Sequence, residues 1–174
     1  MAKKLDLSLL SPGWFSDEDA QRLFDAAVSA PPGAFLEIGV YRGRSAGVLQ
    51  QADPDRELWL FDNCADCGVT PRTWPKGDNV HKFYRALTDA DLNDIGHIAL
   101  LHHDGDHRCE AVTRDLQQIG PHIVTGGFIV LHDWGQANHD NDCGVEPGWL
   151  AWPGRADYEE VFTYREQAAF RKIR

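Results

Sequence analysis

Four apolar segments that end at a glycine turn or an acidic residue constrain the fold of this chain most strongly. They are Phe35–Val40, Leu58–Asp62, His97–Asp104 and Phe128–Asp133. Nearly continuous apolar strands that alternate with helical patterns are typical of a parallel sheet covered by helices on both faces. Parallel strands end at one edge of their sheet, and we therefore expect Gly39, Asp62, Asp104 and Asp133 to meet around a common cleft.

The pattern along the chain predicts the order of the elements. Ser16 is a helix-capping residue, and one buried helical face follows it, at Ala20, Leu23, Phe24, Ala27 and Val28. Further helices are expected at 45–51, 88–95 and around 112–119, with strands at 35–40, 57–62, 80–86, 97–103 and 128–133, a turn at 125–127, and an antiparallel pair at 158–165 and 168–173. This is an α/β fold with a Rossmann-like, mostly parallel twisted sheet and a C-terminal antiparallel strand pair. We predict one domain, with an N-terminal helical segment (1–33), a cofactor-binding core (34–134), and a loop with the terminal strands (135–174).

Charge and composition exclude several classes of partner. The formal net charge is −10, and an acidic surface repels nucleic-acid phosphates. No window approaches the length of a membrane span. Lys3 and Lys4 are not followed by the apolar stretch of a signal peptide, so reduced cysteines and a cytoplasmic location are expected.

The turn after the first apolar segment suggests a ligand site. Glu37, Gly39, Gly43 and Ser45 lie where the strand gives way to a helix, and glycine there permits positive φ and close approach of a nucleotide-like ligand. Asp62, at the end of the next strand, suits a ribose contact. Two alternatives stay open, namely that Glu37 caps the following helix and that Asp62 is a solvated loop residue.

These residues resemble a known family, the class I S-adenosylmethionine-dependent methyltransferases. Glu37-Ile-Gly39-x-x-x-Gly43-x-Ser45 is similar to their cofactor loop, and Asp62 to their ribose-binding acid. Residues 100–107 and 126–133 resemble the branch of small-molecule O-methyltransferases that use a divalent metal. The resemblance covers about residues 34–134. It implies cofactor binding by the following residues: Glu37, Gly39, Gly43, Ser45, Asp62 and Asp104.

The same resemblance implies a metal site and a base. The metal ligands fall on Asp104, His132 and Asp133, with Mg²⁺ or another divalent ion as the metal, and the general base falls on His107. Members of the branch usually carry two acids where this chain has His132-Asp133. Hydrogen bonding to cofactor or backbone is the alternative role for Asp104 and Asp133.

Other parts of the resemblance are less specific. Thr88 and Asp89 are the candidates for reading adenine. The C-terminal region leaves little room for a helix before the last two strands, so we expect substrate-capping elements to be absent or supplied by a partner subunit in a homo-oligomer.

The chemistry follows from the residue types. Methyl transfer to oxygen is an in-line displacement that depends on alignment of the reactants. A divalent cation bound by carboxylates lowers the pKa of a coordinated hydroxyl, and His107 can accept the proton at neutral pH. We therefore expect a methyltransferase that acts on a small-molecule acceptor. In an extended strand His102 and His103 face opposite sides, so at most one of them belongs to the site.

Several competing interpretations stay open. A nicotinamide-dependent oxidoreductase is disfavoured by Tyr41, which stands where a dinucleotide fingerprint has glycine. A metal-dependent oxygenase would use His102, Asp104 and His132. A methyltransferase-like module that binds its ligand without catalysis is a further alternative. Cys64-x-x-Cys67 is a weak zinc or redox pattern that Cys143 and His139 could complete, and four tryptophans either line an acceptor pocket or cover core edges: Trp74, Trp134, Trp149 and Trp152.

Overall fold

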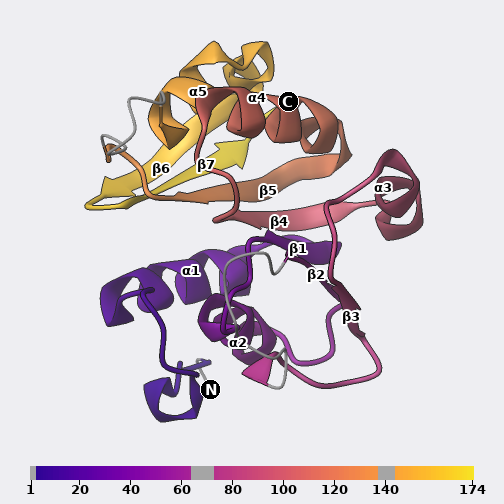
Figure 1. The fold of residues 1–174 in the computed structure, drawn as a ribbon, viewed down its shortest axis with the longest axis vertical. Coiled ribbons are helices and arrows are strands. Elements are labelled where there is room, and N and C mark those ends of the chain that lie inside the picture. Colours follow the sequence, from indigo (N-terminus) through magenta and orange to yellow (C-terminus); the bar gives the residue numbers. More distant parts are fainter. Residues whose placement is uncertain (1–2, 64–72, 137–143) are drawn as a thin grey trace.

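A single mixed sheet forms the centre of the fold. The computed structural model describes residues 3–63, 73–136 and 144–174. Its seven strands are ordered β3-β2-β1-β4-β5-β7-β6 (Figure 1). The first five strands in the chain run parallel, and β7 pairs antiparallel with both β5 and β6. The bounds are β1 (Ala34–Ile38), β2 (Leu58–Phe61), β3 (Val80–Phe83), β4 (Ile98–His103), β5 (Ile123–His132), β6 (Tyr158–Tyr164) and β7 (Gln167–Lys172). The predicted fold class is confirmed.

Helices cover both faces of this sheet. Figure 1 shows α1 (Asp17–Ser29) and α2 (Arg44–Ala52) on one face, and α4 (Cys109–Ile119) with α5 (Val145–Ala151) on the other. The short α3 (Asp89–Ile95) packs into the same core as α4. Successive strand residues alternate between the two cores: Phe35 faces α1 and α2, whereas Leu36 faces α4 and α5.

Local capping chemistry starts α1 where the sequence predicts. The Ser16 side chain accepts a hydrogen bond from the Asp19 backbone N–H, and the first turn carries three acids that complement the helix dipole. The buried face is as predicted apart from Val28, which is 43% exposed. The prediction for Val28 is wrong because the buried face of the helix also includes Asp19 and Ala26, which places Val28 at its edge.

Two expectations about the later elements are corrected. The predicted turn at 125–127 lies inside β5, where the register against β4 shifts between Ile98 and Leu100. Gly126, at φ +83°, allows this bulge, so residues typical of a turn interrupt the ladder without ending the strand. The chain also contains α5 ahead of the terminal strands. Pro147 and Gly148 obscured it, but Pro147 is in the first turn, and Gly148 lets α5 pack closely on Val112.

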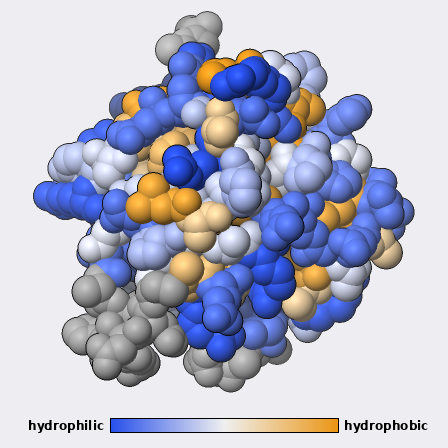
Figure 2. All heavy atoms as spheres, turned by 90° about the horizontal axis from the view of Figure 1, so that it is seen from above, coloured by the Kyte–Doolittle hydropathy of each residue, from blue (hydrophilic) through white to orange (hydrophobic). Residues whose placement is uncertain are grey.

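One face of the molecule shows how polar and apolar side chains are distributed on it. The face in Figure 2 is mostly hydrophilic, with hydrophobic side chains in small separate groups. Among the described residues, no helix combines the length and the apolar character that crossing a membrane requires. The suggested Cys64, Cys67, His139 and Cys143 site lies outside the described residues.

Candidate functional site

The glycine loop after β1 packs directly against the end of β4. Gly39 has a φ of +82°, and a Cβ at this position would lie 2.0 Å from the Asp104 carbonyl oxygen. The Asp104 backbone N–H in turn donates to the Ile38 carbonyl at 2.8 Å. Glycine is therefore required at position 39 by the close approach of two backbone segments. This contact sets the distance between the loop and Asp104.

Asp62 holds the same loop from the end of β2. Its Oδ2 accepts hydrogen bonds from the backbone N–H groups of Val40, at 2.8 Å, and Tyr41, at 2.7 Å. Tyr41 has a φ of +47°, and its carbonyl accepts a hydrogen bond from the indole of the buried Trp74 at 2.8 Å. The loop is thus fixed from both sides, and Trp74 belongs to the protein interior instead of an acceptor pocket.

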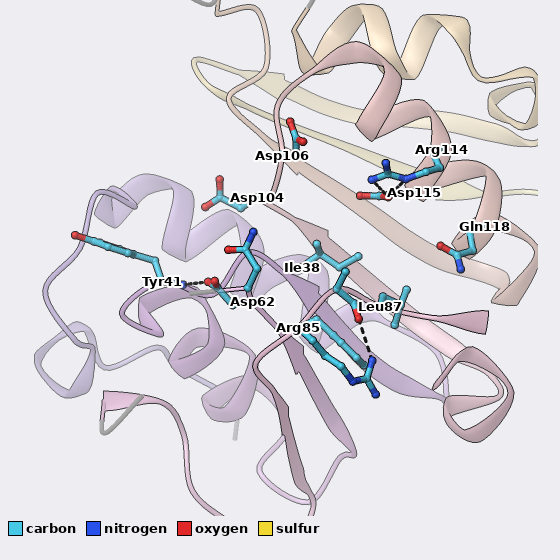
Figure 3. Close-up of a pocket in the computed structure, with 15 residues that line it drawn as sticks. Ile38, Tyr41, Asp62, Arg85, Leu87, Asp104, Asp106, Arg114, Asp115 and Gln118 are labelled. Carbon is cyan, nitrogen blue, oxygen red and sulfur yellow. Dashed lines mark hydrogen bonds and ion pairs between the residues drawn. The ribbon is translucent and has the colours of Figure 1, made fainter. Parts of the chain in front are cut away.

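A cavity of about 650 Å³ opens at this edge of the sheet. Figure 3 shows Asp62, Asp104 and Asp106 lining it from the strand ends, while α4 supplies the far wall and the Tyr41 ring points away. Its volume lies in the range of about 300–1,000 Å³ that is usual for small-molecule and cofactor sites. The lining residues are Ile38, Gly39, Tyr41, Phe61, Asp62, Asn63, Arg85, Ala86, Leu87, Asp104, Gly105, Asp106, Arg114, Asp115 and Gln118.

Next to the cavity, three side chains offer ligand atoms to a metal ion. Asp104, His107 and Asp133 each place one such atom within 4.8 Å of the others. His107 Nε2 lies 3.1 Å from Asp133 Oδ2 and 3.5 Å from Asp104 Oδ1. The nearby Asp104 carboxylate raises the pKa of His107 above its ordinary value. Asp133 itself has a φ of +55°, a strained conformation for a residue other than glycine.

His132 approaches the same two carboxylates from the buried side. Its Nδ1 lies 3.3 Å from Asp104 Oδ1 and 3.4 Å from Asp133 Oδ2, and its Nε2 lies 3.9 Å from Asp19 Oδ2 of α1. Burial opposes a charged imidazole, but the neighbouring carboxylates of Asp104, Asp133 and Asp19 raise the pKa of His132 to about 12. Burial likewise opposes ionisation of Asp104, yet its histidine partners hold its pKa well below the usual value.

Glu37 and Ser45 lie together in the core under α2, away from the cavity. Glu37 is fully buried and accepts a hydrogen bond from the Ser45 hydroxyl, while His102 Nδ1 lies 3.1 Å from the same carboxylate oxygen. Burial raises the pKa of Glu37. Gly43 is the N-cap residue of α2, at φ +76°. Gly39, Asp62 and Asp104 therefore line the cavity, whereas the other three predicted cofactor-binding residues do not.

Comparison with known proteins identifies the family. The methyltransferase domain family matches residues 36–134, more than half of the chain. The chain belongs to this methyltransferase family. No curated protein sequence matches it.

Solved structures show the same fold. An alignment with MycE, a methyltransferase of mycinamycin biosynthesis determined with Mg, SAH and mycinamycin VI, covers 92% of this chain and 50% of MycE, at 19% identity and a TM-score of 0.66. CalS11, a TDP-rhamnose 3'-O-methyltransferase of calicheamicin biosynthesis, is 18% identical with a TM-score of 0.64. The alignment covers 90% of this chain and 81% of CalS11. The O-methyltransferase NovP is 18% identical with a TM-score of 0.58, and the alignment covers 89% of this chain and 79% of NovP. The chain spans about half the length of MycE.

Several residues that line the cavity were not predicted from the sequence. Thr88 caps α3, and Asp89 accepts a hydrogen bond from Gln118. Neither Thr88 nor Asp89 lines the cavity, whose side chains at that end are those of Arg85, Asp115 and Gln118. Burial opposes ionisation of Asp115, but the hydrogen bond from His103 keeps its pKa below the ordinary value. Asp115 and Gln118 carried no spacing signal because α4 contributes them from its packing against the sheet, and Arg85 lies between β3 and α3. His102 and His103 face opposite sides of the sheet, as predicted.

Proposed function

We propose that this methyltransferase uses S-adenosylmethionine to methylate an oxygen atom of a small molecule, with help from a divalent cation. The observation that carries the proposal is that Asp104 belongs to both parts of the site. It lines the cavity at the strand ends and also lies in the carboxylate–histidine cluster beside it. A cofactor in the cavity would therefore lie next to a bound cation. The cytoplasmic location and self-association stay predictions of the sequence.

The cavity suits an adenosine-containing cofactor in size and polarity. We assign cofactor contact to Gly39, Asp62 and Asp104, which line it, and treat Glu37, Gly43 and Ser45 as supports of the loop. When bound, S-adenosylmethionine supplies an electrophilic methyl group. The fixed loop and the α4 wall would align that group and exclude water, which is the main contribution expected of a protein in a displacement reaction.

The cluster suits a cation and a base. We assign the metal to Asp104, His132 and Asp133, whose donor atoms face one another. A bound cation supplies charge that lowers the pKa of an acceptor hydroxyl. We assign proton acceptance to His107, which is one-third exposed and is the outermost member of the cluster. The nearby Asp104 carboxylate favours the protonated form of His107.

Binding of S-adenosylhomocysteine tests the cofactor assignment. Isothermal titration of the wild-type protein should show binding, and Asp62→Ala should weaken it at least tenfold, about 1.4 kcal/mol. Asp55→Ala, which removes an exposed acid from the turn before β2, is the matched control and should bind normally. Absence of binding by the wild-type protein would refute the assignment.

Turnover tests the chemical step. His107→Ala should lower the rate about 10²–10⁴-fold, the usual contribution of a general base, with cofactor affinity unchanged. His97→Ala, an exposed histidine at the opposite end of β4, should have normal activity. Removal of the metal with a chelator should also abolish turnover. If the cofactor binds but a broad panel of hydroxyl-bearing acceptors is never methylated, the non-catalytic interpretation is correct instead.

A further inference from the structure

The carboxylate–histidine cluster contains the buried His132 of β5, whose Nε2 faces the Asp19 carboxylate of α1. We propose that Asp104, His132 and Asp133 form a mixed nitrogen-and-oxygen site suited to a transition ion such as Co²⁺, Mn²⁺ or Zn²⁺ more than to Mg²⁺, and that Asp19 is the positioning residue for His132. This rests on the proposed function for the place of the metal. It adds the class of metal and a residue outside the resembling segment.

The spacing of the His132 nitrogen from each carboxylate matches ligation of one shared ion. His132 Nδ1 lies 3.3 Å from Asp104 Oδ1 and 3.4 Å from Asp133 Oδ2. Ligand atoms held at about 2.0–2.2 Å from one cation are roughly 2.8–3.1 Å apart in octahedral geometry and roughly 3.3–3.6 Å apart in tetrahedral geometry. Mg²⁺ takes oxygen ligands almost exclusively, whereas imidazole suits Zn²⁺, Fe²⁺ and related ions. The presence of His132 as a ligand therefore shifts the donor set away from Mg²⁺.

The Asp19 carboxylate faces the other ring nitrogen of His132. Its Oδ2 lies 3.9 Å from His132 Nε2, as an ion pair longer than a hydrogen bond, and both side chains are more than nine-tenths buried. Asp19 Oδ1 and His132 Nε2 are buried atoms with no hydrogen-bond partner among the described residues. Histidines that bind metals almost always direct their second nitrogen to a carboxylate, carbonyl or water, which fixes the ring and strengthens the ligand.

The N-terminal segment holds Asp19 in place. The Phe15 ring lies 5.2 Å from the His132 ring, and the Phe15 carbonyl accepts a hydrogen bond from Arg44 Nε at 2.7 Å. Arg44 also donates to the Ser11 carbonyl at 3.0 Å and pairs with Asp17. One side chain of α2 thus fixes the start of α1 over the metal site.

The simpler role for Asp19 is helix capping alone. Ser16 Oγ donates to Asp19 Oδ2 and accepts the Asp19 backbone N–H, so Asp19 stabilises the first turn of α1 whatever else it does. Ser16→Ala removes this cap and leaves the carboxylate facing His132. A purely structural role predicts equal effects of Ser16→Ala and Asp19→Asn on metal binding, whereas the positioning role predicts an effect of Asp19→Asn alone.

Metal titrations of the purified chain without cofactor test the proposal. Most protein sites bind Co²⁺ more tightly than Mg²⁺, so the measured quantity is the ratio of the two affinities, with Co²⁺ also followed by its visible absorption. His132→Glu, which restores an all-oxygen set, should reduce this ratio at least tenfold. Asp19→Asn should weaken Co²⁺ binding about 10–100-fold, while Ser16→Ala and the exposed Glu18→Gln should leave it unchanged.

Specific results would overturn the proposal. An unchanged affinity ratio in His132→Glu would remove His132 from the ligand set. Loss of Co²⁺ binding in His107→Ala but not in His132→Glu would make His107 the nitrogen ligand. Equal effects of Ser16→Ala and Asp19→Asn would reduce Asp19 to a cap, and if Asp19→Asn fails to fold, the His132→Glu ratio still decides the class of metal. S-adenosylhomocysteine titration of the same preparations tells failure of the proposed function apart from failure of the metal assignment.

Discussion

Replacement of Gly39 by alanine tests whether the glycine loop is shaped by contact with the end of β4. Two costs combine in Gly39→Ala. An L-residue in the left-handed region costs about 1–2 kcal/mol, and a Cβ placed 2.0 Å from the Asp104 carbonyl oxygen must displace backbone. Forced overpacking of this kind costs a further 1–3 kcal/mol, roughly. We expect Gly39→Ala to lower the free energy of unfolding by about 2–5 kcal/mol in total.

Gly126→Ala provides the matched control for backbone strain. Gly126 has nearly the same φ, +83° against +82° for Gly39, but the nearest atom to its Cβ would be Pro31 Cγ, at an ordinary 3.9 Å. We expect this variant to lose only the conformational part, about 1–2 kcal/mol. Urea denaturation of both variants, followed by circular dichroism, gives the difference that belongs to the clash.

The same pair of variants connects the loop to ligand binding. Because the clash moves the backbone that carries Asp104, Gly39→Ala should weaken S-adenosylhomocysteine binding at least tenfold, whereas Gly126→Ala should bind normally. Equal destabilisation of the two variants, together with normal binding by Gly39→Ala, would refute the reasoning. Glycine at position 39 would then serve close approach of the ligand, as the sequence alone suggests.

Three further predictions concern the supports of the site. Arg44→Ala removes the polar contacts that fix the N-terminal segment and should lower the free energy of unfolding in urea by about 1–3 kcal/mol. Asp17→Asn, which removes only the exposed partner, should lower it by less than about 1 kcal/mol. The hydrogen bond from Arg85 holds the pKa of Asp91 below its ordinary value of 3.8, so ionised Asp91 stabilises the fold at neutral pH. The difference in unfolding free energy between the wild type and Asp91→Asn should be full above about pH 4 and shrink as the pH falls further. A difference that grows in acid would contradict this. Glu37→Gln should bind the cofactor with an affinity within about threefold of the wild type, a difference well under 1 kcal/mol, because Glu37 does not reach the cavity. A larger loss of affinity in calorimetry would show that Glu37 contacts the cofactor.

Some site residues were missed or misplaced because their contacts are not local. Glu37 follows the cofactor-loop pattern, yet the pleat of β1 turns it toward Ser45 and the core under α2. Asp19 carries no signal beyond its spacing from Ser16, which is that of a capping residue. Its position near His132 depends on how α1 docks across the sheet.

The sequence by itself determined the alternation of strands and helices and the polar residues that end the strands. Gly39, Asp62 and Asp104 line one cavity, and Asp133 lies beside Asp104. That much follows from local periodicity, since a buried strand is recognisable wherever its neighbours lie, and parallel strands must end at one edge. Only the tertiary structure decided which side chains face the cavity and which carboxylate lies behind His132. Those contacts join segments far apart in the chain, and they are fixed by packing of helices on the sheet, which no local pattern records.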